Sequence, residues 1–164
     1  MKNMSNLLIC KRLSKLWQGF YNRRRPMHKS KQEETKMDKN VRKVLNEQVW
    51  YLATYDKEPN AVPVAFKTVL EDGTLAVGDV FMETTLRNIQ ANRKIAVSVC
   101  NASTMEGYQI KGTAQYVTSG ETVKMFKQQV ETLFQGKTTA KGVLIITPER
   151  VIVTTPGPEN KKEL

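Results

Sequence analysis

Histidine is nearly absent from this chain of 164 residues, and the only one, His28, lies in its amino-terminal section. Residues 37–164 therefore contain no histidine at all. This excludes a Ser-His-Asp triad, a histidine-ligated metal and histidine general-base chemistry from that section. If residues 37–164 carry out chemistry, we expect a bound cofactor to do it, with no metal and no catalytic side chain.

Long hydrophobic runs are also missing, because the longest apolar stretch is the five residues 49–53. A membrane-spanning helix needs about 20 such residues, so we expect none. The two cysteines, Cys10 and Cys100, show neither a disulfide nor a zinc spacing, which favours a reducing, cytoplasmic setting. A domain usually takes about 100 to 200 residues, so the chain has room for one core of ordinary size.

The net charge of +10 is distributed unevenly along the chain. Residues 1–36 hold ten Lys or Arg and two Glu, a net charge of +8, whereas residues 37–164 hold sixteen Lys or Arg and fourteen Asp or Glu, a net charge of +2. Nothing in residues 37–164 therefore favours nucleic acid as a partner. We expect one folded domain over residues 37–164 and a basic, disordered or spurious extension over residues 1–36.

Two interpretations of residues 1–36 stay open. Apolar residues of the stretch 5–21 recur at helical spacing opposite lysine and arginine, which is typical of a basic helix on an anionic membrane surface. Alternatively, Met37 is the natural first residue, because a capped helix follows it and the codons of residues 32–34 can contain a purine-rich ribosome-binding sequence. We favour the misassigned start and do not expect membrane attachment.

Residues 37–164 contain many hairpin patterns and few helical ones. Clusters of β-branched and aromatic residues between turn signals predict strands at 49–55, 61–70, 74–78, 95–100, 108–118, 142–147 and 150–155. Helical periodicity predicts a helix ending near 48 and capped by Asp38 or Asn40, another from Thr84 or Thr85 to about 92, and a third at about 120–134. Because hairpins predominate, the sheet should be mainly antiparallel and closed into a barrel.

Four segments share an order and spacing with a known family. They are 61–67 (AVPVAFK), 71–75 (EDGTL), 78–89 (GDVFMETTLRNI) and 107–114 (GYQIKGTA). Residues from about Met37 onward thereby resemble the pyridoxamine 5'-phosphate oxidase-like, FMN-binding split-barrel family, and within it the small FMN-binding proteins of anaerobes. The resemblance implies a mainly β fold with a few helices, arranged as a six-stranded antiparallel split barrel. It also implies a homodimer that holds FMN in two clefts along its interface.

By the same resemblance, two segments flank the isoalloxazine ring of the cofactor. The first is a strand segment that runs beside the ring: Pro63, Val64, Ala65 and Phe66. Backbone groups of Val64, Ala65 and Phe66 are expected to bond the polar edge of the ring. The second approaches from the neighbouring connection: Asp79, Val80 and Phe81.

Thr84, Thr85 and Asn88 are expected around the FMN phosphate. Two threonines at the start of a helix offer hydroxyls and unpaired N–H groups, and the helix dipole favours an anion there. Either threonine could instead be only a helix cap. The family commonly has a lysine where Thr84 stands, so the cation that a phosphate favours must come from another residue. The candidates are Lys67, Arg87 and Lys111.

We therefore expect an FMN-binding flavoprotein that acts as a flavin-dependent oxidoreductase on an undefined substrate. Pyridoxamine 5'-phosphate oxidase activity itself is not expected, because that enzyme holds its substrate with His and Arg near the carboxyl end. This chain has no histidine there, and its only late arginine is Arg150. The alternative is a non-enzymatic flavin carrier, electron-transfer or sensor module, or a barrel in which FMN binding has weakened.

Overall fold

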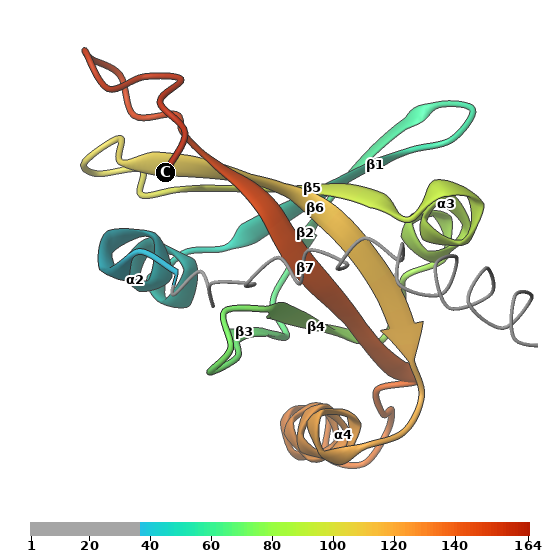
Figure 1. Cartoon of the computed structure of the whole chain (residues 1–164). Coiled ribbons are helices and arrows are strands. Elements are labelled where there is room, and N and C mark those ends of the chain that lie inside the picture. Colours follow the sequence, from blue (N-terminus) through green and yellow to red (C-terminus); the bar gives the residue numbers. More distant parts are fainter. Residues whose placement is uncertain (1–36) are drawn as a thin grey trace, which may run out of the picture. The chain divides into compact units, whose positions relative to one another are not determined.

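The computed structural model describes residues 37–164. The expectations for residues 1–36 lie outside the described residues. The described elements follow one another in the order α2 (Lys39–Glu47), β1 (Trp50–Tyr55), β2 (Pro59–Val64), β3 (Lys67–Val69), β4 (Leu75–Asp79), α3 (Thr84–Asn92), β5 (Lys94–Cys100), β6 (Gly107–Val117), α4 (Glu121–Leu133) and β7 (Gly142–Val153) (Figure 1). None of the helices within residues 37–164 has the length and apolar content that crossing a membrane requires.

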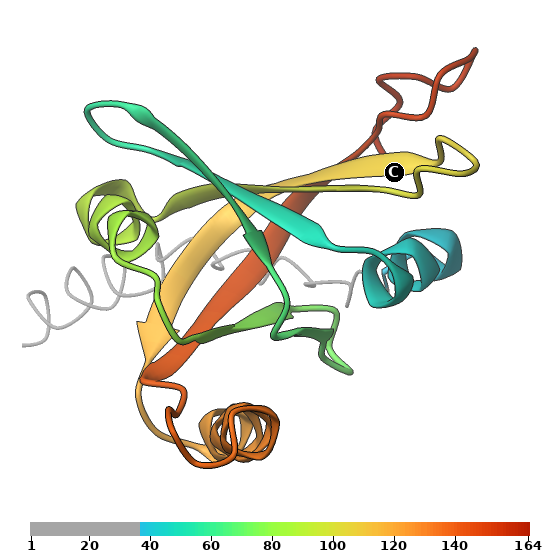
Figure 2. The ribbon, with the colours of Figure 1, turned by 180° about the vertical axis from the view of Figure 1, so that it is seen from behind.

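The strands form a single antiparallel sheet in the order β2-β1-β5-β6-β7-β4-β3. This sheet is strongly curled, with the long strands β6 and β7 near its middle (Figures 1 and 2). Its edge strands, β2 and β3, are consecutive in the chain and are joined by a bend at Ala65 and Phe66. The curled sheet therefore almost closes on itself, but no hydrogen-bonded ladder joins its two edge strands, β2 and β3. The expected mainly β split barrel is confirmed.

The sheet has seven strands, not the expected six, and the strand boundaries differ at two places. The bend at Ala65 and Phe66 divides the expected strand 61–70 into β2 and β3. The two strands expected on either side of Pro148 form the single strand β7. The ladder between β6 and β7 accommodates this proline by a register shift, with an extra residue, Glu149, forming a bulge.

Each helix covers a different part of the curled sheet (Figure 1). The Asp38 side chain caps α2 by accepting hydrogen bonds from the N–H groups of Asn40 and Val41, as one of the two expected caps. Helix α2 contacts β3 and β5, α3 contacts β1, β5 and β6, and α4 contacts β4 and β7.

Successive side chains along a strand such as β1 are alternately buried and exposed. In β1, Trp50 and Leu52 are fully buried, whereas Tyr51 and Tyr55 are more than half exposed. The larger core cluster fills the inside of the curl: Trp50, Leu52, Val77, Val97, Ile110 and Leu144 are among its members. A smaller cluster surrounds Phe126 of α4 and includes Ala76 and Val143. Helix α4 therefore covers the opposite face of β4 and β7.

Gly112 is required by the close approach of β7 at the bulge. A Cβ atom at this position would lie 2.1 Å from the carbonyl oxygen of Thr147. Because the obstacle is backbone, Gly112→Ala should lower the free energy of unfolding by about 1–3 kcal/mol. Ser98→Ala, at an exposed position of β5, should change it by less than about 0.5 kcal/mol. Urea unfolding measures both values, and wild-type stability for Gly112→Ala would contradict the register described for β6 and β7.

Candidate functional site

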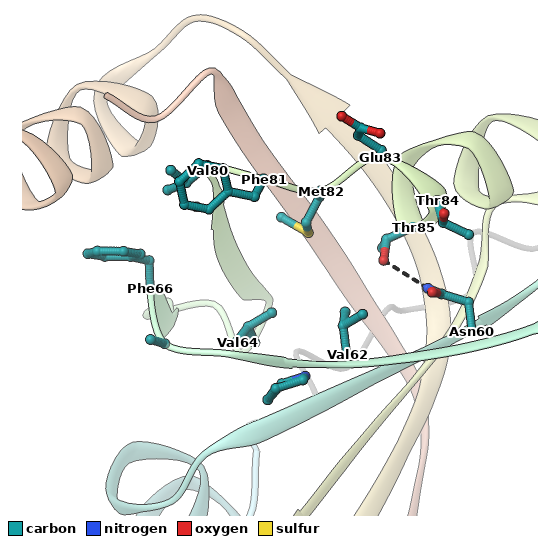
Figure 3. A pocket seen from close by; sticks show the side chains of 13 residues that line it. Asn60, Val62, Val64, Phe66, Val80, Phe81, Met82, Glu83, Thr84 and Thr85 are labelled. Atoms are coloured by element: carbon teal, nitrogen blue, oxygen red, sulfur yellow. Dashed lines mark hydrogen bonds between the residues drawn. The ribbon is translucent and has the colours of Figure 1, made fainter. Parts of the chain in front are cut away.

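A cavity of about 490 Å³ lies between β2 and the connection from β4 to α3. This volume is within the range of about 300–1,000 Å³ that is usual for ligand sites. Because β2 is an edge strand, no other strand of residues 37–164 pairs with its open side. Figure 3 shows side chains of β2 on one side of the cavity and side chains of residues 80–85 on the other.

The walls of the cavity are mostly apolar. Every second residue along β2 and just beyond its end points into the cavity, so that the side chains of Val62, Val64 and Phe66 share one side of the strand (Figure 3). Val80 and Met82 lie across from them. Walls of this kind suit the planar apolar body of a ligand.

The other end of the cavity is polar and is held by partly buried hydrogen bonds. The Asn60 amide donates to the hydroxyl of Thr85 at 3.0 Å (Figure 3). It also donates to the hydroxyl of Thr54 at 3.1 Å. Thr85 is only 2% exposed, yet it contributes to the cavity lining. Because its oxygen accepts from Asn60, its hydroxyl proton is free to be donated to a ligand.

Helix α3 begins at the same polar end. Thr84 and Thr85 lie in its first turn, and the N-cap is Glu83, whose side chain makes no capping hydrogen bond. The first-turn N–H groups consequently have no partner within the helix. The Arg87 guanidinium donates to the Thr84 hydroxyl at 3.4 Å, which places a cation beside it. Glu83 adds a negative charge to the cavity lining.

Eight of the twelve residues predicted to bind a cofactor line this one cavity: Pro63, Val64, Ala65, Phe66, Val80, Phe81, Thr84 and Thr85. The remaining four do not line it: Lys67, Asp79, Asn88 and Lys111. Five further residues line the cavity without having been predicted from the sequence: Asn60, Val62, Gly78, Met82 and Glu83. The alternation of Val62 and Val64, extended back by two residues, indicates Asn60, which lies just before the strand predicted at 61–70.

Lys67 is directed at the carboxyl end of α2. Its ammonium group donates to the carbonyl oxygens of Leu45 at 2.5 Å and Asn46 at 3.0 Å, and it lies 5.1 Å from the centre of the Trp50 ring. Partial burial lowers the pKa of Lys67. This lysine thus caps a helix whose last carbonyl groups carry partial negative charge.

Asn88 and Asp79 are buried behind the cavity lining. The Asn88 amide donates to the Thr54 hydroxyl at 3.1 Å, the same hydroxyl that accepts from Asn60. The Asp79 carboxylate accepts from the backbone N–H of Met82 and from the Tyr116 hydroxyl, each at 2.8 Å. Both side chains therefore make their contacts with groups that support the cavity.

Lys111 lies at a different place on the sheet. It is exposed and lines a separate hollow of about 440 Å³ together with Lys94 and Arg150. Among residues 37–164, no group of three or more His, Cys, Asp or Glu side chains could hold a metal ion.

The curled antiparallel sheet defines a split-barrel domain, and the cavity at its open edge is a candidate ligand site with mainly apolar walls. The profile of the pyridoxamine 5'-phosphate oxidase family matches residues 37–155. An uncharacterized protein of Methanocaldococcus jannaschii is 31% identical to this chain over 131 residues, which are 77% of this chain and 87% of that protein. The chain belongs to the pyridoxamine 5'-phosphate oxidase family.

Solved structures share the fold. The crystal structure of HupZ from Group A Streptococcus has a TM-score of 0.65 and 26% identity, over 75% of this chain and 98% of that one. An FMN-binding protein from Syntrophomonas wolfei has a TM-score of 0.59 and 14% identity, over 92% of this chain and 99% of that one. The split-barrel fold is therefore common to proteins of very different sequence.

The contacts of Lys67 predict a role in stability. Lys67→Met removes both hydrogen bonds to the end of α2, so it should lower the free energy of unfolding by about 1 kcal/mol. Lys111→Met, at an exposed position of β6, should change it by less than about 0.5 kcal/mol. Thermal or urea unfolding at neutral pH compares the two variants, and equal stabilities would contradict the capping role of Lys67.

Proposed function

We propose that this protein binds FMN in the cavity beside β2 and is a flavin-dependent oxidoreductase. The observation that carries the proposal is that one cavity combines apolar walls with the hydroxyl-bearing first turn of α3. Family membership supports it, and so does the shared fold of the Syntrophomonas FMN-binding protein. Residues 37–164 would form the FMN-binding domain.

The apolar part of the cavity fits the ring of the flavin. Val62 and Val64 on one side and Met82 on the other would enclose its faces. An edge strand also presents N–H and C=O groups that no neighbouring strand pairs. Backbone groups of residues 64–66 could therefore bond the polar edge of the ring, which is the role predicted for them.

The polar part of the cavity fits the phosphate. The first-turn N–H groups of α3, the hydroxyls of Thr84 and Thr85 and the positive end of the helix dipole all favour an anion. Arg87 would supply the cation, because Lys67 is bonded to α2 and Lys111 lies at another hollow. Glu83 would oppose the phosphate, so affinity depends on Arg87 outweighing it.

Bound FMN would supply the group that accepts and returns hydride or electrons. The chain's own residues would bind the phosphate, orient the ring and exclude water from one of its faces. Among residues 37–164, Glu83 is the only titratable side chain that lines the cavity. This composition agrees with a reaction in which no side chain serves as nucleophile.

We also infer that two copies of the chain form a homodimer. Several aromatic side chains are exposed in the described protomer, at 53% for Tyr51, 59% for Tyr55 and 76% for Phe81. Phe81 lies at the cavity, so a second copy that covers it would also close the site. Sedimentation equilibrium of the purified protein would measure the mass of the assembly, and a monomer at micromolar concentration would refute this inference.

A non-enzymatic flavin carrier is the second candidate, and Glu83 at the polar end favours it because a weakly held flavin can be passed on. NADH oxidation with an added acceptor separates the two candidates. Continuous turnover by the FMN-loaded protein indicates an enzyme. Retention of FMN without turnover, followed by its transfer to an apoflavoprotein, indicates a carrier.

The phosphate site predicts a preference for FMN over riboflavin. The purified protein should bind FMN in a saturable manner, at one per protomer, and at least about tenfold more tightly than riboflavin, because only FMN reaches the first turn of α3. Titration followed by flavin fluorescence measures both dissociation constants. Equal affinity for the two flavins would exclude a phosphate site at α3, and no binding of either would refute the proposed function.

Arg87 should account for much of that preference. Arg87→Gln should weaken FMN binding about tenfold and leave riboflavin binding unchanged, because a charge-assisted hydrogen bond contributes roughly 1.5–3 kcal/mol. Lys94→Gln makes the same change of charge at an exposed position that lines another hollow. It should leave both affinities unaltered. If the two variants lose FMN affinity equally, the effect is one of net charge and Arg87 has no specific role.

A further inference from the structure

Asp79 is a buried carboxylate whose contacts are all internal to the described domain. It is 1% exposed and lies at the end of β4, directly before the segment that forms one wall of the cavity. One carboxylate oxygen accepts from the Met82 N–H and the other from the Tyr116 hydroxyl, both at 2.8 Å. Its backbone carbonyl also accepts from the N–H of Lys141 at 2.8 Å. Asp79 is thus fixed at three atoms.

Tyr116 reaches Asp79 across an intervening strand. Tyr116 is on β6 and Asp79 is on β4, and β7 lies between these strands in the sheet. Strands in a sheet are about 4.8 Å apart, so the two backbones are separated by roughly twice that distance. The residue of β7 that pairs with Asp79 is Gly142. A Cβ atom there would lie 2.6 Å from the Tyr116 hydroxyl and 2.6 Å from the Val117 carbonyl oxygen, so both the tyrosine and the neighbouring backbone require glycine at this position.

Tyr116 remains a hydrogen-bond donor over the ordinary pH range. Burial, followed by the hydrogen bond to Asp79 and the charge of that carboxylate, raises the pKa of the Tyr116 hydroxyl well above its usual value. A protonated phenol and a carboxylate make a short, charge-assisted hydrogen bond. The bridge between β6 and β4 therefore persists wherever the protein is folded at neutral pH.

Residues 80–83 follow Asp79 directly in the chain. This segment lies between the end of β4 and the start of α3, and its residue Phe81 would lose exposed surface if it folded inward. The hydrogen bond from Met82 to Asp79 holds the turn that they form. Phe81 stays 76% exposed while Val80 is buried and Met82 lines the cavity.

We propose, on the basis of the FMN-binding function proposed above, that Asp79 and Tyr116 are positioning residues that hold residues 80–83 as a preformed wall of the ligand cavity. Asp79 does not contact the ligand in this role. A preformed wall lowers the ordering cost of binding, so ligand affinity depends on a pair of residues outside the cavity lining. Gly142 belongs to the same arrangement, because its lack of a side chain permits the hydrogen bond between Tyr116 and Asp79.

Amide hydrogen exchange of the ligand-free protein tests the positioning role directly. Tyr116→Phe removes the donor to Asp79 and should accelerate exchange in residues 80–83 about tenfold, the effect of one net hydrogen bond. Tyr108→Phe is the matched control, because Tyr108 is also on β6 and also donates to a carboxylate, that of Glu106, at 2.7 Å. This control should leave exchange in residues 80–83 unchanged.

Substitutions of Asp79 separate geometry from charge. Asp79→Ala should loosen residues 80–83 as Tyr116→Phe does, whereas Asp79→Asn should restore most of the protection, because its amide oxygen can still accept from Met82. The dissociation constant for FMN should follow the same order, with about tenfold weakening for Tyr116→Phe and Asp79→Ala. Faster exchange that is uniform over all elements, or wild-type exchange in Tyr116→Phe, would overturn the proposal.

These measurements distinguish the failure of this inference from the failure of the proposed function. A wild-type protein that binds FMN while Tyr116→Phe binds it equally well refutes the positioning role alone. A wild-type protein that binds no FMN refutes the proposed function, and the exchange pattern of residues 80–83 still decides whether the pair holds the wall.

Discussion

The open side of β2 is the structural constraint on which the candidate site depends. β2 pairs with β1 on one side only, because the chain bends at Ala65 and Phe66 and the next strand joins the far edge of the sheet. If β2 and β3 were joined by a hydrogen-bonded ladder, the free backbone N–H and C=O groups of β2 would be paired, and a ligand could not reach this edge of the strand. The split instead leaves a strand edge, the connection from β4 to α3 and the start of a helix around one hollow.

Side chains outside the cavity hold each part of its lining in place. Thr54 and Asn88 support Asn60 and the polar end, and Lys67 ties the bend after β2 to the end of α2. Asp79 and Tyr116 support the segment on the other side. Several of the polar residues near the site therefore hold the cavity lining in position. This structural role agrees with the proposal that a bound cofactor, and no side chain, carries out the chemistry.

The sequence predicted the fold better than the details of the site. Period-two alternation and turn signals predict most strands. Pro148 wrongly predicts a strand break, because a bulge cannot be recognised in the sequence without the partner strand. Residues 63–66 and 84–85, which the sequence predicts to bind one cofactor, line one cavity in the structure. For Lys67 and Asn88, residue type alone could not show which way the side chain points. The orientation of Asp79 could not be predicted either, because its hydrogen-bond partner Tyr116 is 37 residues away along the chain.

A titration of the isotope-labelled protein with FMN, followed by amide chemical shifts, tests the central claim most directly. Binding at the proposed site predicts that the largest shifts fall in two stretches, residues 62–66 and 80–86, and that the first turn of α3 responds to FMN but not to riboflavin. Shifts centred instead on Lys94, Lys111 and Arg150, or the absence of saturable shifts anywhere, would contradict the assignment of the cavity beside β2 as a flavin site.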